Sequence, residues 1–551
     1  MDQPVGNLSE SAVAYKAIAA VVAGLICYQL FFNAASSYKL PVWAPLEIAL
    51  TTYLVNAGGL GRRIYSTFRR YDGSLFGLSK RHQVLINLPN IDRFTHFGKE
   101  LLTSGIVVSQ GHHTLEHLPT QLALMKRVFG SDDSPEFVAC CDAAVKSLLA
   151  IVEKEFVTEI PSTAALQRSH IDRNMSSLVT FTSRKEDMQI WERFANTKVI
   201  VQPGPDEAGA VEADLMSLMR DFGAAAAIPV LYGKDFLQRN PSLLEDFWRF
   251  DNDLFPLLIV GLPTWLPFKF VREGLAARTR LITAMNGLYR RIDQYQKGEP
   301  VDFGADMSDV GVAMDRNKVY AKHNVPIKYR ADLDFPFLWG QNGNTQPLLF
   351  WYVIYAYSTP GLVDRYREEM APYVRLSSEK GPIKIESVDI SALNRECPLM
   401  KSALFEVFRL GSEPTSIRRI AKPITVTDGE YKHQLEPGSY ISAPYAVIQN
   451  DPAVFSEPEK FVPERFLEVD AETGKKLPRY GRLRPWGIGS GSCKGRTFAE
   501  KEILTIAACL MSVWDLEPAH GKWEIPAMMP GTGAKRPVND IRVILRQRVL
   551  K

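Results

Sequence analysis

The sequence has few cysteines, no zinc-binding motif and almost no net charge. Its 551 residues include six cysteines at irregular spacing, which argues against a disulfide framework and for a reducing compartment. Neither a CxxC pair nor an HExxH motif is present, so the sequence has no recognisable zinc-binding motif. A formal net charge of +3 without a basic tract argues against a nucleic-acid-binding protein. What remains is the composition of an ordinary globular chain, with 46% hydrophobic and 23% charged residues.

Two apolar segments lie near the N-terminus. After a polar tail at 1–16, residues 17–35 are almost wholly apolar and long enough to span a bilayer. A cleaved signal peptide is the alternative, disfavoured because Lys16 is the only basic residue before the run. The segment 36–70 is either a membrane-proximal linker or a second span. Basic residues around and after it indicate the cytosolic side, so residues 71–551 are predicted to form a cytosolic catalytic domain.

Residues 90–330 have apolar residues at helical spacing, separated by Gly and Pro signals. Within them, the segment 250–268 is unusually apolar for one with so many helix breakers. A buried loop is possible, but its backbone groups would be hard to satisfy. Its Trp and Phe residues favour contact with a membrane surface.

The stretch 484–496, Arg-Pro-Trp-Gly-Ile-Gly-Ser-Gly-Ser-Cys-Lys-Gly-Arg, holds one cysteine among four glycines. A helix is predicted directly afterwards, from 497 to about 514. A thiol just before a helix lies at the positive end of the helix dipole, which favours the thiolate. Glycines on both sides let backbone N–H groups approach the sulfur. The pattern indicates a metal-bound sulfur at Cys493, or else only a buried cysteine in a glycine-rich turn.

A second informative stretch is Gln-Asn-Gly-Asn-Thr at 341–345, inside a long apolar helix predicted to run to about 357. Pro347 removes one backbone hydrogen bond and bends this helix. Polar side chains are costly to bury without partners, so the cluster indicates a site or a hydrogen-bonded core.

Downstream, Glu406 and Arg409 share one face of a helix predicted over 398–410. Strand-like segments follow at 424–427 and 439–444. Next comes Phe-Val-Pro-Glu-Arg-Phe at 461–466, which includes Arg465.

Together these motifs resemble the cytochrome P-450 family. Trp486, Gly489, Cys493 and Gly495 resemble its haem-binding signature, with Trp where Phe is usual and Gly491 where an Arg is common. Glu406, Arg409 and Arg465 match a buried three-way salt bridge of the family. Asn344 and Thr345 fall on its long central helix, where most members carry an acid followed by an alcohol.

The resemblance implies a mainly α fold with small β-sheets, as one large catalytic domain behind an N-terminal anchor. It implies haem b with Cys493 as thiolate ligand of the iron. Trp486, Gly489, Gly495 and Arg418 are expected to contact the haem. Thr345 and Asn344 are expected to steer protons, while Glu406, Arg409 and Arg465 are structural.

The Phe-Asp, Phe-Pro and Gly-Leu-Pro run at 250–263 resembles one branch of the family, which contains cholesterol 7α-hydroxylase, sterol 12α-hydroxylase and prostacyclin synthase. It implies a monooxygenase of the endoplasmic reticulum membrane that oxidises a lipophilic terpenoid or steroid-like substrate with O₂. Electrons would come from NADPH through cytochrome P-450 reductase, docking on a basic face formed by Arg482, Arg484, Lys494, Arg496 and Lys501. Asn344 in place of the acid leaves open a reductase-independent isomerase or dehydratase acting on a peroxide. A haem-binding protein without turnover is a third hypothesis.

Overall fold

The computed structural model describes one short strand and most of the chain from residue 114 onward. The described residues are 82–84, 114–132, 134–204, 207–259, 264–302, 307–428, 431–435, 437, 440–445, 449–450, 452, 454–487, 492–529 and 533–550. The predicted tail, membrane helix and linker or second span all lie outside these residues.

Helices form most of the described chain. Ser134 caps one of them, accepting a hydrogen bond from Phe137 N at 3.2 Å. Prolines lie in the first turn of two others, α6 and α20, where no helical donor is lost. The helices, with short 3-10 or π segments marked η, are α6 (Leu118–Leu124), η1 (Met125–Phe129), α7 (Pro135–Phe156), α8 (Glu159–Arg168), α9 (Ile171–Ser176), η2 (Lys185–Asp187), α10 (Ile190–Phe194), α11 (Leu215–Tyr232), α12 (Lys234–Arg239), α13 (Leu243–Arg249), η3 (Phe250–Leu254), α14 (Phe255–Ile259), α15 (Lys269–Gln296), η4 (Met307–Asp309), α16 (Gly311–Lys322), α17 (Ile327–Ser358), α18 (Leu362–Met370), α19 (Ile390–Glu396), α20 (Pro398–Gly411) and α22 (Arg496–Val513).

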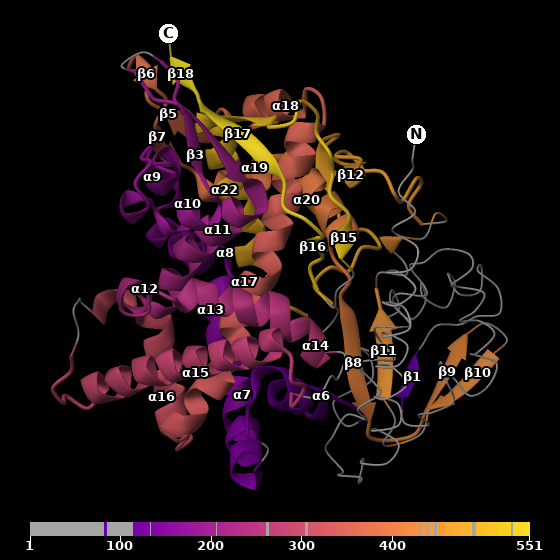
Figure 1. The fold of residues 1–551 in the computed structure, drawn as a ribbon. Coiled ribbons are helices and arrows are strands. Elements are labelled where there is room, and N and C mark those ends of the chain that lie inside the picture. The colour runs from indigo at the N-terminus through magenta and orange to yellow at the C-terminus, as the bar shows by residue number, and fades with distance from the viewer. Residues whose placement is uncertain are drawn as a thin grey trace, which may run out of the picture.

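The longest of these helices, α17, has 32 residues and runs through the middle of the fold (Figure 1). It packs against α11, α15, α20 and α22. Apolar side chains lie on all sides of it, as expected of a helix enclosed by others. Pro336 and Pro347 both lie within it, and each removes a backbone donor from the helix.

The strands form small sheets at the periphery. One sheet has the order β1-β11-β8-β2, in which β1 runs parallel to β11 and the other pairs are antiparallel. A second, fully antiparallel sheet has the order β14-β17-β4-β3. The strands are β1 (His82–Val84), β2 (Leu115–Glu116), β3 (Lys198–Val201), β4 (Ala210–Asp214), β5 (Val374–Leu376), β6 (Gly381–Pro382), β7 (Ile385–Val388), β8 (Thr415–Ile420), β9 (Ile424–Asp428), β10 (Tyr431–Leu435), β11 (Tyr440–Pro444), β12 (Leu467–Val469), β13 (Lys476–Pro478), β14 (Trp514–Pro518), β15 (Met528–Met529), β16 (Arg536–Pro537), β17 (Arg542–Gln547) and β18 (Val549–Leu550).

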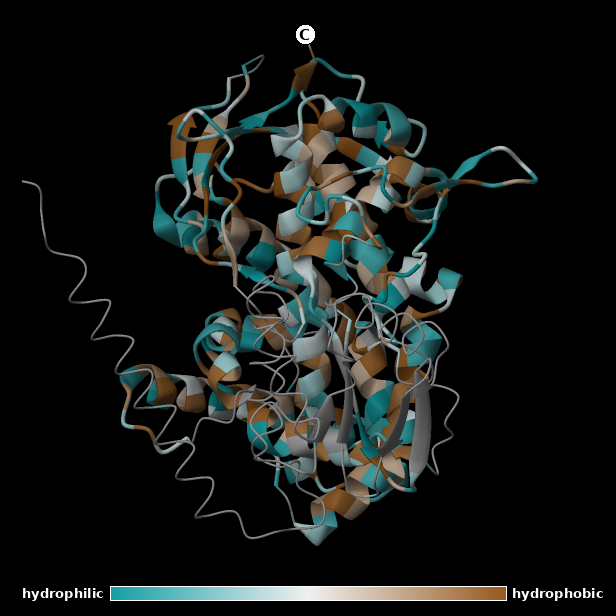
Figure 2. Ribbon diagram, turned by 90° about the vertical axis from the view of Figure 1, so that its right-hand side faces the viewer, coloured by the Kyte–Doolittle hydropathy of each residue, from teal (hydrophilic) through white to brown (hydrophobic). Residues whose placement is uncertain are grey.

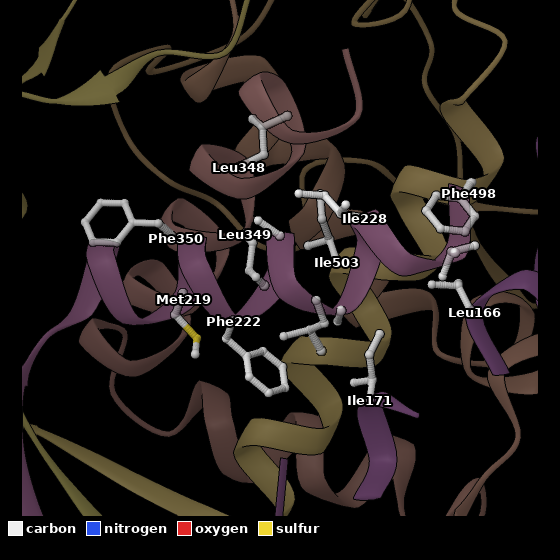
Figure 3. Packing of buried hydrophobic residues seen from close by; sticks show 14 of the residues in the cluster. Leu166, Ile171, Met219, Phe222, Ile228, Leu348, Leu349, Phe350, Phe498 and Ile503 are labelled. Atoms are coloured by element: carbon white, nitrogen blue, oxygen red, sulfur yellow. The ribbon is translucent and has the colours of Figure 1, made fainter. Parts of the chain in front are cut away.

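The predicted mainly helical fold with small sheets is therefore confirmed. Figure 3 shows the part of its core where side chains of α8, α9, α11, α17 and α22 meet. Figure 2 shows hydrophobic and hydrophilic residues alternating along most helices, the pattern of amphipathic helices that bury one face. Among the described residues, only α11 is long and apolar enough to cross a membrane. Because 78% of α11 is buried inside the fold, it is placed as a core helix.

The segment 250–268, for which we expected a loop at a membrane surface, is different in its first half. Residues 250–259 form η3 and α14, and Phe250, Leu254 and Phe255 are buried. Helical hydrogen bonds satisfy the backbone there, which removes the objection to burial. Exposed aromatic side chains begin only beyond this part, at Trp265, Phe268 and Phe270.

A buried ion pair joins α16 to α17. The Arg316 guanidinium contacts the Asp334 carboxylate, and both side chains are almost fully buried. Tyr232 of α11 donates to Asp334 Oδ2 at 2.8 Å, and Tyr320 donates to Oδ1 at 3.1 Å. This network ties α11, α16 and α17 together.

Arg316→Met is expected to lower the free energy of unfolding by about 3–5 kcal/mol, because it leaves a buried carboxylate without its cation. Combining it with Asp334→Asn should restore much of the loss, since the uncompensated charge is then gone. Arg249→Met, which breaks an exposed pair with Glu245, should cost less than about 1 kcal/mol. Denaturant midpoints of the four proteins test this, and equal effects of Arg316→Met and Arg249→Met would contradict it.

Candidate active site

Cys493 lies in a closed turn three residues before α22. Its backbone N–H donates to the carbonyl of Trp486 at 2.9 Å, which joins the two ends of the loop. Gly487 begins the loop with φ of +69°, a conformation that favours glycine. Gly489, for which we expected a haem contact, lies outside the described residues, as does Gly491.

The Cys493 thiol is accessible although protein atoms surround it. Among the described cysteines it alone is exposed, whereas Cys141, Cys397 and Cys509 are buried. Burial nevertheless raises the pKa of the Cys493 thiol, while the N–H of Gly495 and the nearby cations lower it. A sulfur that is open to a ligand and receives a backbone N–H matches the donor chemistry of a thiolate bound to haem iron. The residues present therefore fit the haem that the motif implies.

Trp486 attaches the cysteine loop to two helices. Its ring packs edge-on against Phe408 of α20, with centroids 4.9 Å apart. Its indole N–H donates to the Tyr480 hydroxyl at 2.8 Å, and Tyr480 in turn donates to Glu500 Oε1 of α22 at 2.6 Å. The start of the cysteine loop is thus held by packing on one side and by a chain of hydrogen bonds on the other.

The structure brings Glu406, Arg409 and Arg465 together. Arg409 donates to both carboxylate oxygens of Glu406, at 2.7 and 2.8 Å. Arg465 Nε lies 2.9 and 3.0 Å from the same two oxygens, and Val462 N donates to Oε1 at 3.1 Å. Glu406 and Arg409 are fully buried, so these charges have few alternative partners.

On α17, Asn344 and Thr345 have different surroundings. Asn344 Oδ1 accepts a hydrogen bond from Ala534 N at 3.0 Å. Because a backbone N–H can only donate, this contact fixes which end of the amide faces Ala534. Thr345 is buried, and no hydrogen bond of its hydroxyl is found among the described residues. Pro347 lacks the N–H that would otherwise donate to the Gly343 carbonyl. That carbonyl therefore has no helical hydrogen bond from residue 347 and can accept one from another group.

A buried carboxylic acid contacts Gln346, the residue after Thr345, and sequence reasoning missed it. Glu502 of α22 is buried, and its Oε1 lies 3.2 Å from Gln346 Nε2 of α17. Burial raises the pKa of Glu502 to about 8, more than the Gln346 hydrogen bond lowers it. Gly223 of α11 packs directly against the Gln346 side chain, since a Cβ at this position would lie only 1.9 Å from Gln346 Oε1. Glu502 lies on α22, a helix whose residues are buried on every side. A Glu within such an enclosed helix is the signal that could have identified this acid.

The remaining predicted residues fall in separate places. Arg418 is buried on β8, where burial lowers its pKa. The prediction that Lys501 lies on a basic docking face is wrong. Its side chain is fully buried and its ammonium donates to Ser162, Thr163 and the Glu159 carbonyl. It joins α22 to α8, while Lys494 remains partly exposed beside Glu153 at 3.4 Å.

Comparisons with known proteins agree with this geometry. The family model described as Cytochrome P450 matches residues 337–542. A "Cytochrome P450 monooxygenase" of Gibberella zeae is 28% identical over 310 residues, covering 56% of this chain and 56% of the relative. Mouse Cytochrome P450 7B1 is 27% identical over 299 residues, covering 52% and 55%. The 7-alpha-hydroxycholest-4-en-3-one 12-alpha-hydroxylase of Oryctolagus cuniculus is 29% identical over 233 residues, covering 40% and 45%.

The chain thus spans about half the length of the curated relatives that it matches. Among solved structures, retinoic acid bound cyanobacterial CYP120A1 has the same fold. Its TM-score is 0.56 at 16% identity, over 81% of this chain and 88% of that one.

Glu502 is expected to make the free energy of unfolding depend on pH. Between its ordinary pKa of 4.5 and its folded pKa of about 8, the folded state binds a proton that the unfolded state has released. Stability is therefore expected to fall as pH rises through this window, by up to about 1.4 kcal/mol per pH unit. Glu502→Gln, which is neutral at every pH, should flatten this slope. Thermal midpoints from pH 5 to 8 measure it, and equal slopes for the two proteins would contradict the assignment.

Proposed function

We propose that this chain, a member of the cytochrome P450 family from its sterol-hydroxylase branch, is a haem-thiolate monooxygenase. The observation that carries the proposal is the accessible Cys493 thiol, which receives the Gly495 N–H at the start of α22. Haem bound through this sulfur would supply the activation of dioxygen. The likeness of the chain to sterol hydroxylases supports a lipophilic, steroid-like or terpenoid substrate, in sterol or secondary metabolism.

In this proposal each residue of the site has a task. Cys493 holds the iron, and Trp486 and Gly495 keep the loop in place. Arg418, whose guanidinium is buried, holds a negative group of the cofactor. The Thr345 hydroxyl both donates and accepts, so it holds a water and moves a proton, while Asn344 orients it.

We further propose that the enzyme works at a membrane surface, on the cytosolic side of the endoplasmic reticulum. Trp265, Phe268 and Phe270 are exposed near the start of α15, and the two Phe rings stack with centroids 5.5 Å apart. Lys269 and Arg272 lie among them and are exposed as well. Aromatic rings beside cations suit the interface between lipid headgroups and hydrocarbon. NADPH would deliver electrons through cytochrome P450 reductase, docking near Lys494 and Arg496.

Asn344 favours one alternative, a reductase-independent isomerase or dehydratase that acts on a peroxide. Its amide carries no acidic proton, and its Oδ1 is already occupied by Ala534 N. Such an enzyme would need neither NADPH nor O₂. The two functions are therefore separated by their cosubstrates.

The test is turnover of a sterol and terpenoid panel by haem-loaded protein with the reductase, NADPH and ¹⁸O₂. We expect a product that carries one labelled oxygen. Cys493→Ala should abolish both this product and the absorbance spectrum of a thiolate-bound haem. Cys140→Ala, at a half-buried cysteine of α7, is the matched control and should retain both.

Turnover of a hydroperoxide without NADPH and O₂, together with no label from any sterol or terpenoid, would favour the isomerase instead. Retention of the thiolate spectrum in Cys493→Ala would overturn the site assignment.

A further inference from the structure

Asp251 is a buried carboxylate that the proposed chemistry does not use. It lies in η3, its side chain is 1% exposed, and it belongs to the Phe-Asp pair of the apolar segment. Trp339 Nε1 of α17 donates to its Oδ1 at 2.7 Å. Arg536 of β16 pairs with its Oδ2 at 2.5 Å and donates from Nη1 to its backbone carbonyl at 2.7 Å. One charge thus joins three stretches that are far apart in the sequence.

The Trp339 indole is held on three sides. Besides the bond to Asp251, it stacks on Phe255 with ring centroids 4.5 Å apart and an interplanar angle of 15°. It lies over Gly343, where a Cβ would come within 2.8 Å of Nε1. Trp339 is only partly buried, and it precedes Thr345 by fewer than two turns of α17. The ring therefore has one fixed position close to the residues proposed to act on the substrate.

Arg536 ends a segment, 533–536, that is fastened along its length. Ala534 N donates to Asn344 of α17, and the Trp351 indole donates to the Lys535 carbonyl at 2.8 Å. Lys535 N donates to the Gly411 carbonyl at the end of α20, at 2.7 Å. Asp251 fixes the last residue of this segment. The segment and Trp339 are consequently positioned by the same carboxylate.

We propose that Asp251 is a positioning residue for substrate selection. By holding Trp339 against Gly343 and segment 533–536 against Asn344, it fixes the protein packed on α17 just before Thr345. The inference rests on the proposed haem site and adds to it which residue determines the ligand shapes admitted. Trp339 needs only an acceptor from Asp251, whereas Arg536 needs its charge. Substitutions can therefore release the two partners separately.

The test uses haem-loaded, full-length protein and optical titration with two azoles that ligate haem iron, imidazole and the bulky clotrimazole. The readout is the ratio of their dissociation constants, which does not require the natural substrate. Asp251→Leu should lower the clotrimazole-to-imidazole ratio by about tenfold, the size of a modest pocket discrimination. Asp251→Asn keeps an acceptor for Trp339 and should give a smaller change. Trp339→Phe keeps an aromatic ring, smaller and without the N–H donor, and should move the ratio in the same direction as Asp251→Leu.

Asp246→Asn is the matched control. Asp246 is also a buried carboxylate paired with an arginine, Arg280, at 2.5 Å, but this pair joins α13 to α15 and contacts neither Trp339 nor segment 533–536. It should lower the thermal midpoint without moving the azole ratio. A ratio unchanged within about twofold in Asp251→Leu and Trp339→Phe, or an equal change in Asp246→Asn, would overturn the proposal. Failure of the wild-type protein to bind either azole would instead contradict the haem site.

Discussion

The region behind the cysteine loop depends on one buried carboxylate, that of Glu406. It holds two guanidinium groups, and these in turn satisfy the backbone of a stretch with little regular structure. Irregular backbone inside a protein needs donors for its carbonyl groups, because no neighbouring strand or helical turn supplies them. Arg409 and Arg465 supply them here, to the carbonyls of Gln449, Ser456, Glu457, Pro458 and Lys460. Removing one charge would leave the others buried and uncompensated, so the group acts as a unit.

Much of the site was accessible from the sequence because its signals are local. The helix at 398–410, the strand at 424–427 and the helix after Cys493 correspond to α20, β9 and α22. Glu406 and Arg409 meet because residues three apart share a helical face. The contact of Arg465 with Glu406 could be predicted only from the family resemblance, since 59 positions separate the two residues. The cluster of polar side chains at 341–345 was recognised from the sequence, but the hydrogen bonds that each of them makes were not.

The rest depends on contacts between distant residues, which no local pattern encodes. Lys501 looked like a surface cation, and only the packing of α8 against α22 shows that it is buried. The acid of Glu502 and the carboxylate of Asp251 likewise acquire their roles from partners on α17. The segment 250–259 was misjudged because the helix breakers of the whole stretch 250–268 suggested a loop, whereas this part contains only Pro256, which lies within α14.

The position of β17 has a consequence for synthesis of the protein. This strand lies between β14 and β4, so it completes a sheet whose other half was made much earlier in translation. Arg542 pairs with Asp214, 328 positions before it. Until β17 has left the ribosome, β4 therefore presents one unpaired edge. That edge is open to incorrect strand pairing until β17 closes the sheet.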